Sequence, residues 1–153
     1  MYSLKNLTID DIELNIDSKD WVDSIKKASV KLVERNIIEE KYIDAMIDSV
    51  LKFGPYIVIA KNVALSHARP EEGAIETKLY FTTLKNDIEF GELDNDPVKL
   101  LIVLSAKDSN SHLELLCQLG SILEKREIVE KLLDAKTREE FLNVILEAVD
   151  EIQ

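Results

Sequence analysis

The stretch Leu100-Leu101-Ile102-Val103-Leu104 decides the fold class of this chain. A half-exposed strand alternates apolar and polar side chains, whereas an unbroken apolar run of this length is typical of a central strand covered on both faces. Strand patterns precede this run, and helical patterns lie on both sides of it. We therefore expect an α/β fold, in which residues 1–153 form a single three-layer domain with a mixed central β-sheet and helices on both faces.

The neighbouring elements are predicted from hydrophobic periodicity and turn residues. Lys85-Asn86-Asp87 is expected to be the turn of a hairpin over residues 77–90, which would make the sheet mixed. Gly54-Pro55 is expected to end the second helix, because proline cannot continue one. Strand patterns occupy residues 12–16, 56–60, 63–65, 77–84 and 88–90, and helical patterns occupy residues 21–33, 42–51, 113–123, 128–133 and 141–149.

The composition limits the classes of partner. The chain has 153 residues with 30 acidic and 19 basic side chains, a formal net charge of −11. This acidity counts against nucleic acids and anionic membrane surfaces, both of which attract clustered Lys and Arg. The apolar runs at residues 56–60 and 100–104 are far shorter than the roughly 20 residues that insert across a membrane.

The cellular compartment is predicted from sequence features that are missing. Residues 1–5 do not begin a basic-then-apolar signal segment. Cys117, the one cysteine in the chain, cannot form an internal disulfide. We expect it to lie on a helix and to point into the hydrophobic core. We therefore expect a cytoplasmic protein.

Several cofactor and metal motifs are missing. The four glycines form neither a phosphate-binding loop nor a dinucleotide fingerprint. There is no C-x-x-C motif and no pair of histidines four residues apart, so a zinc site of ordinary spacing is not expected. The sequence predicts no cofactor and no metal.

Two histidines remain as candidates for chemistry, and each follows a predicted strand. His67 comes after residues 63–65, and His112 comes after the central strand and a short loop. A capping box, Ser111-x-x-Glu114, predicts His112 in the first turn of a helix, where the N–H groups and the helix dipole favour anions and a neutral imidazole. Because strand ends in α/β sheets form clefts, the two histidines could share one site. Two separate surface histidines are the other interpretation.

Arg69 lies two residues after His67 and allows more than one role. Its guanidinium could bind a phosphate through two hydrogen bonds, or it could form a surface ion pair with Glu71 or Glu72. Two histidines and an arginine suit phosphoryl transfer through a neutral imidazole. They also suit acid–base cleavage of a phosphodiester, although neither histidine lies in the H-x-[ST] triplet of two-histidine phosphoesterases.

A resemblance to a known family narrows these alternatives. GPYIVIA at residues 54–60 and VALSHARPEEG at residues 63–73 resemble the phosphorylation site of enzyme IIA of the phosphoenolpyruvate-dependent sugar phosphotransferase system. The similarity is to the mannitol–fructose superfamily, and most of all to its ascorbate-type subgroup. His112 falls where that family has its second histidine. The family usually has proline before the phosphorylated histidine, and this chain has Ser66, whose hydroxyl is expected to contact the phosphate.

The resemblance implies a phosphotransferase with a phosphohistidine intermediate. His67 would accept a phosphoryl group from the phosphocarrier HPr and pass it to a cysteine of enzyme IIB, which serves sugar uptake through the membrane permease IIC. His112 would orient and stabilise the group, and Arg69 would bind it. Such a chain would dock anionic phosphoproteins, so we expect the face around both histidines to be less acidic than the rest, or apolar.

Two other functions remain open from the sequence. One is a regulatory protein of the same family that reads phosphorylation state without serving transport. The other is a hydrolase that uses the histidine pair.

Overall fold

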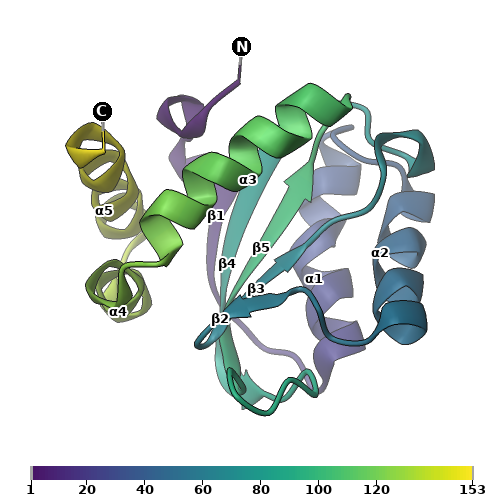
Figure 1. Cartoon of the computed structure of the whole chain (residues 1–153), viewed down its shortest axis with the longest axis horizontal. Helices are drawn as coiled ribbons and strands as arrows, with labels where there is room; N and C mark the ends of the chain where they lie inside the picture. Colours follow the sequence, from purple (N-terminus) through teal and green to yellow (C-terminus); the bar gives the residue numbers. More distant parts are fainter. Residues whose placement is uncertain (1, 153) are drawn as a thin grey trace.

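The computed structural model describes residues 2–152, and within them five β-strands and five α-helices form three layers (Figure 1). The sheet has the strand order β1-β4-β5-β3-β2, with α1 and α2 on one face and α3, α4 and α5 on the other. This confirms the predicted α/β fold with a mixed sheet and helices on both faces. The elements are β1 (Ile12–Ile16), α1 (Trp21–Glu34), α2 (Glu40–Phe53), β2 (Val58–Ala60), β3 (Val63–Ser66), β4 (Lys78–Ile88), β5 (Val98–Ser105), α3 (Ser109–Leu123), α4 (Arg126–Asp134) and α5 (Arg138–Glu151).

Strand β5 is the central strand that the apolar run predicted. It pairs parallel with β3 and antiparallel with β4. Leu100, Ile102 and Leu104 pack into the core under α3, α4 and α5, whereas Leu101 and Val103 pack into the core under α1 and α2. Because each face of β5 meets its own hydrophobic core, the strand needs no polar alternation.

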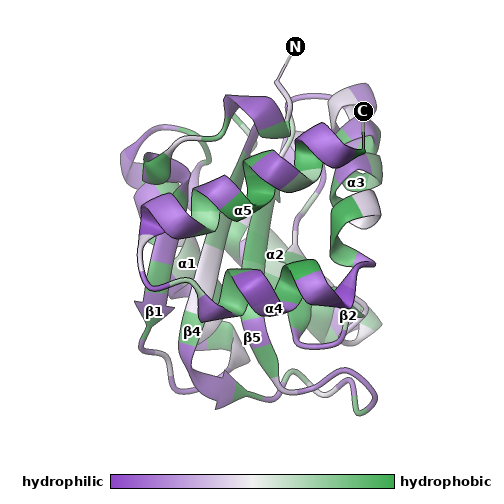
Figure 2. Cartoon of the chain, turned by 90° about the vertical axis from the view of Figure 1, so that its left-hand side faces the viewer, coloured by the Kyte–Doolittle hydropathy of each residue, from purple (hydrophilic) through white to green (hydrophobic). Residues whose placement is uncertain are grey.

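Each helix buries an apolar face against the sheet and exposes a polar face to solvent. Figure 2 shows hydrophilic residues along the outward sides of α4 and α5, with hydrophobic residues toward the sheet. Beneath them Phe81 of β4 and Phe141 of α5 meet edge to face, with ring centroids 5.8 Å apart. None of the helices within residues 2–152 combines the length and the apolar character needed to cross a membrane.

The hairpin predicted at residues 77–90 is wrong. β4 continues through the expected turn, and Ile88 lies opposite Val98 of β5. Residues 85–87 are exposed there, so their polar side chains are solvated without breaking the strand. The chain reverses after Ile88 instead, in a loop where the Asp96 carboxylate accepts hydrogen bonds from the amides of Phe90 and Gly91. The sheet is mixed because β4 and β5 form the antiparallel pair, as do β2 and β3.

The helical pattern of residues 113–123 predicted α3, but it did not predict correctly which residues of the helix are buried. Leu113 is 64% exposed, and Cys117 is exposed instead of lying in the core. The periodicity identified a helix but not its rotation about its axis, which packing against the sheet sets. The residues of α3 that enter the core are Leu115, Leu119, Ile122 and Leu123.

Candidate functional site

Strand β3 places His67 at the carboxyl-terminal edge of the sheet. Ser66, its last residue, lies opposite Val103 of β5, and His67 follows directly. The His67 ring is half-buried, and its Nδ1 lies 3.2 Å from the Leu65 carbonyl oxygen. With a proton on Nδ1 this contact is a hydrogen bond to the carbonyl, and Nε2 then carries a free lone pair. The backbone of β3 thus favours one position and one tautomer of the ring.

Helix α3 places His112 beside His67. The helix begins at Ser109, because the Asp108 carboxylate caps it by accepting a hydrogen bond of 2.7 Å from the Ser111 amide. The predicted cap at Ser111 is therefore wrong, although His112 does lie in the first turn. The His112 amide already donates to the Asp108 carbonyl at 3.2 Å, so it is not free for an anion.

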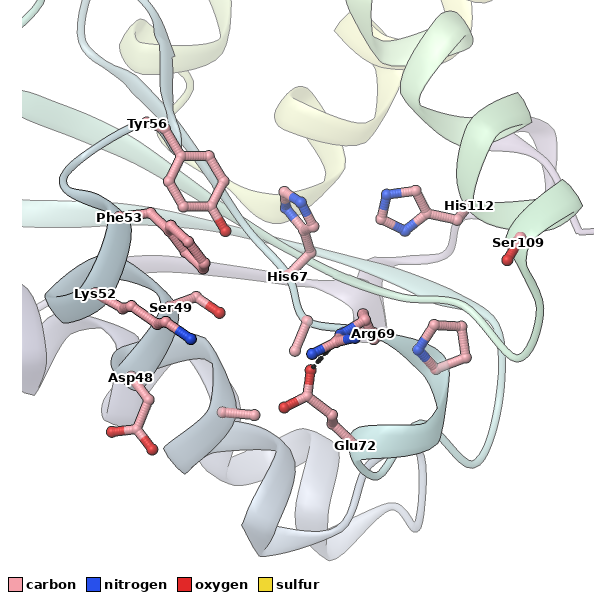
Figure 3. Close-up of a pocket in the computed structure, with 13 residues that line it drawn as sticks. Asp48, Ser49, Lys52, Phe53, Tyr56, His67, Arg69, Glu72, Ser109 and His112 are labelled. Carbon is pink, nitrogen blue, oxygen red and sulfur yellow. Dashed lines mark hydrogen bonds and ion pairs between the residues drawn. The ribbon is translucent and has the colours of Figure 1, made fainter.

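The two imidazole rings meet in one cavity (Figure 3). Their centroids are 5.0 Å apart, and the ring planes make an angle of 61°. β3 and β5 are neighbouring parallel strands, so the residues that follow them emerge at the same edge of the sheet. The structure thus brings the two histidines into one site, which is one of the two interpretations that the sequence left open.

Both histidines favour the neutral form. Burial lowers the pKa of His67 below its usual value, a shift that the hydrogen bond with Leu65 opposes and the nearby His112 reinforces. Burial also lowers the pKa of His112. At neutral pH the cavity therefore holds two uncharged imidazoles, one of which already has its Nδ1 occupied.

The cavity is larger than the histidine pair and has a volume of about 700 Å³. Its charged lining residues are two cations, Lys52 and Arg69, and two carboxylates, Asp48 and Glu72, so the lining has no net charge while the chain carries −11. For the residues that line the cavity, this agrees with the prediction that the surroundings of the histidines are less acidic than the rest of the chain. Its lining residues are Ala45, Asp48, Ser49, Lys52, Phe53, Tyr56, His67, Ala68, Arg69, Pro70, Glu72, Ser109 and His112.

Aromatic side chains form one wall of the cavity, and sequence reasoning did not assign them to it. The Tyr56 ring meets His67 edge to face, with centroids 6.1 Å apart, and Phe53 meets Tyr56 at 6.5 Å. Both rings are also exposed, at 47% for Tyr56 and 67% for Phe53. The signal was present in the sequence, because two aromatic residues flank the Gly54-Pro55 helix end just before β2, the strand that precedes β3 and His67.

Arg69 lies at the cavity in a surface ion pair, one of the two roles that the sequence left open. Its Nε is 3.4 Å from a Glu72 carboxylate oxygen and 3.8 Å from one of Glu71. The side chain is 79% exposed, so these contacts are solvated and weak. Glu72 also accepts a hydrogen bond from the Arg69 amide at 3.2 Å, which places the carboxylate beside the arginine.

Ser66 does not join the site. Its side chain is 1% exposed, and its hydroxyl donates to the Met46 sulfur at 3.1 Å, inside the core under α2. Successive side chains of a strand point to opposite faces, so a residue adjacent to His67 turns toward the core. The expected contact between the Ser66 hydroxyl and a phosphate is therefore wrong for this arrangement. Within the described part of the chain, no group of three or more His, Cys, Asp or Glu side chains is placed to hold a metal ion.

Comparisons with known proteins agree with this architecture. The sequence model of the family described as "Phosphoenolpyruvate-dependent sugar phosphotransferase system, EIIA 2" matches residues 5–148. The ascorbate-specific PTS system EIIA component of Escherichia coli K12 is 38% identical over 135 residues, which cover 88% of each chain. The mannitol-specific cryptic phosphotransferase enzyme IIA component of the same strain is 41% identical over 128 residues, covering 84% of this chain and 86% of that one.

Solved structures show the same fold. The mannitol-specific cryptic phosphotransferase enzyme IIA of E. coli has a TM-score of 0.83 at 36% identity, over 95% of this chain and 99% of that one. E. coli mannitol enzyme IIA, solved in complex with phosphorylated enzyme IIB, has a TM-score of 0.81 over 93% and 98% of the two chains. At 22% identity, that second likeness concerns the fold alone.

Proposed function

The chain belongs to the EIIA 2 family of the phosphoenolpyruvate-dependent sugar phosphotransferase system, and on this premise we propose that it is a phosphocarrier. His67 accepts a phosphoryl group from phosphorylated HPr and passes it to a cysteine of an enzyme IIB. Residues 1–153 act as one IIA domain in the cytoplasm and serve sugar uptake through a membrane permease IIC. The partners named here are those of the family, and the chemistry is inferred from the geometry of the site.

One observation carries the chemical part of the proposal: the half-buried imidazole of His67 is held by its own strand beside a second imidazole. The contact between Nδ1 and the Leu65 carbonyl leaves Nε2 of His67 with the lone pair that attack on phosphorus requires. A protonated ring would lack that lone pair, and burial disfavours protonation. His67 is thereby a nucleophile without help from a metal or a base.

The transfer step exchanges one phosphorus–nitrogen bond for another. Nε2 of His67 attacks the phosphorus of the donor phosphohistidine, and the donor imidazole leaves with the electron pair of the breaking bond. The product on His67 remains a reactive phosphoramidate, so a cysteine thiolate of enzyme IIB can attack its phosphorus in turn. That step forms a phosphorus–sulfur bond and breaks the phosphorus–nitrogen bond, and the His67 imidazole leaves with the electron pair. In both steps catalysis depends on positioning the group and stabilising its equatorial oxygens.

His112 and Arg69 supply that stabilisation in the proposal. The His112 ring lies against His67 and can donate a hydrogen bond to a phosphoryl oxygen. The Arg69 guanidinium is at the cavity but paired with Glu72, so it must exchange a solvated carboxylate for the phosphoryl group. A dianionic phosphoryl group carries more charge than one carboxylate, which favours this exchange.

The proposal is tested by labelling the protein from phosphoenolpyruvate through enzyme I and HPr. We expect about one acid-labile, base-stable phosphoryl group per chain, transferred on to an enzyme IIB cysteine. His67→Ala should abolish the label, whereas Cys117→Ser should retain it, because Cys117 is exposed on α3 and outside the cavity. Failure of the folded wild-type protein to take up label, with a known enzyme IIA labelled in parallel, would contradict the proposal.

The same assay separates the two other functions. A stable, stoichiometric phosphoprotein excludes a hydrolase, which would release phosphate continuously. A phosphoprotein that passes nothing to any enzyme IIB, in cells where its gene deletion alters expression and not sugar uptake, would indicate the regulatory role instead.

A further inference from the structure

Tyr42 of α2 lies behind the site and does not line the cavity, yet it contacts the backbone next to His67. Its side chain is completely buried. Its hydroxyl oxygen is 3.0 Å from the amide nitrogen of Ala68, the residue after His67, and 2.8 Å from the carbonyl oxygen of Leu104 in β5. The Ala68 carbonyl oxygen is a further acceptor at 3.1 Å.

These contacts fall where two strands separate. β3 and β5 are paired up to Ser66 and Val103, and beyond that point the backbone of β3 turns away toward Pro70. The Tyr42 hydroxyl accepts from the Ala68 amide and donates to the Leu104 carbonyl, so it bridges the gap just past the last paired residues, two residues after Ser66 and one after Val103. Without the hydroxyl, a buried amide and a buried carbonyl would each lose a partner.

The bridge is maintained at every ordinary pH. Burial raises the pKa of the Tyr42 hydroxyl to about 12, so the group keeps its proton and remains a donor. The loop after His67 also packs closely against the start of α2 at Gly73, where an added Cβ would lie 3.1 Å from the Tyr42 Cβ. The segment from His67 to Gly73 therefore rests on Tyr42 at its beginning and its end.

We infer that Tyr42 is a positioning residue for phosphoryl transfer, acting through the peptide between His67 and Ala68. The Leu65 carbonyl orients the imidazole from the strand side, and Tyr42 holds the backbone on the loop side. With both anchors, Nε2 stays aimed into the cavity when a donor docks. This inference rests on the proposed function, because it names a residue that serves the same site.

The test compares Tyr42→Phe with Tyr80→Phe. Tyr80 is 1% exposed and its hydroxyl donates to Glu13 at 2.9 Å in a partly buried hydrogen bond. The control therefore also removes a hydrogen-bonding hydroxyl from a buried tyrosine, but on β4 and outside the cavity. We expect Tyr42→Phe to slow labelling of His67 by phosphorylated HPr at least tenfold at saturating donor, and Tyr80→Phe to change it less than twofold. Equal rates in the two variants, whether both are normal or both are slowed, would overturn the inference.

A second readout does not depend on phosphoryl transfer. In ¹⁵N-histidine NMR spectra of the unphosphorylated protein, Tyr42→Phe should shift the His67 ring nitrogens and mix its tautomers, and Tyr80→Phe should leave them unchanged. If the wild-type protein takes up no phosphoryl group but Tyr42→Phe still changes the His67 resonances, the proposed function is refuted, and Tyr42 still positions the His67 ring. Normal labelling with unchanged His67 resonances in Tyr42→Phe would refute the positioning role alone.

A milder substitution covers the case in which Tyr42→Phe does not fold. Placing 3-fluorotyrosine at position 42 keeps the ring and the hydroxyl but makes the oxygen a poorer acceptor for the Ala68 amide. We expect a severalfold slower labelling rate and a smaller shift of the same His67 resonances. The same analogue at position 80 is the control, and identical behaviour at the two positions would count against the inference.

Discussion

His67 and His112 reach one cavity from two kinds of backbone. His67 follows β3, which is parallel to the central strand β5. Its Nδ1 lies 3.2 Å from the Leu65 carbonyl oxygen, and the amide of the next residue donates a hydrogen bond to the Tyr42 hydroxyl. His112 projects from the first turn of α3, and its ring makes no hydrogen bond with any residue of the described chain. The strand side of the site is thus held by backbone contacts before any ligand arrives. On the helix side, the ring nitrogens of His112 remain free to bind a ligand.

This difference assigns different duties to two residues of the same type. A nucleophile benefits from a fixed position and a fixed tautomer, which reduce the entropy lost on reaching the transition state. A stabilising group benefits from unused hydrogen-bonding capacity directed at the place where charge develops. If the two histidines have these separate roles, substitutions on the two sides of the site should change the rate of transfer to different extents.

The largest effect should come from removing the free imidazole. We expect His112→Ala to slow phosphorylation of His67 by about 10²-fold, because loss of one stabilising donor costs roughly this factor. The label should still appear on His67 at full stoichiometry after long incubation, measured by quenched-flow labelling. If His112→Ala instead abolishes the label as His67→Ala should, the two histidines do not have separate roles.

The next effect concerns pH. Burial lowers the pKa of His67 and of His112, so both should titrate below the ordinary histidine value of about 6.5 in ¹H–¹⁵N NMR. The unfolded chain then binds more protons than the folded one, so stability is fully present above about pH 6.5 and falls as the pH drops toward the folded pKa values. Thermal unfolding midpoints measured from pH 7.5 to pH 5 should therefore decrease.

The same titration can be repeated on His112→Ala to test whether the two rings interact. In His112→Ala the nearby positive charge can no longer form, so the pKa of His67 should rise while remaining below its ordinary value because of burial. An unchanged or lower His67 pKa in this variant would show that the two rings do not interact as their geometry indicates.

The smallest effect should come from the residue before His67. Ser66 is buried and its hydroxyl meets the Met46 sulfur, so Ser66→Ala removes one weak hydrogen bond in the core and no contact to the cavity. We expect the labelling rate to change less than twofold, with a stability loss of about 1 kcal/mol or less. A rate loss of tenfold or more at unchanged stability would reinstate a phosphate contact for Ser66.

The sequence predicted the elements whose signal is local. The unbroken apolar run of β5, the helical periodicity of α1 and α2, and the histidines after two strands were all visible without a structure. The hairpin at residues 77–90 was not, because Lys85, Asn86 and Asp87 read as a turn in isolation. They lie within β4, whose exposed end lets polar residues remain solvated in an extended strand.

The errors near the site have the same origin. Ser111 and Asp108 are both good helix caps, and the sequence favoured Ser111 because Glu114 completes a capping box. The structure uses Asp108, since α3 starts directly past the end of β5. Phe53 and Tyr56 stand next to the segment that resembles the phosphorylation site, but the sequence did not show that their rings form a wall of the cavity. The anchor at Tyr42 comes from α2, which carries no catalytic motif to mark it.

By itself, the sequence determined that a central strand would be buried on both faces and that His67 and His112 would each follow a strand. These properties depend on the order of residues along the chain and on periodicity. Only the tertiary structure decided that the two rings meet 5.0 Å apart, that Ser66 faces Met46 and that Tyr42 bridges Ala68 and Leu104. Such contacts join residues far apart in the chain, and they depend on helix rotation and strand pairing, which packing of the whole core selects.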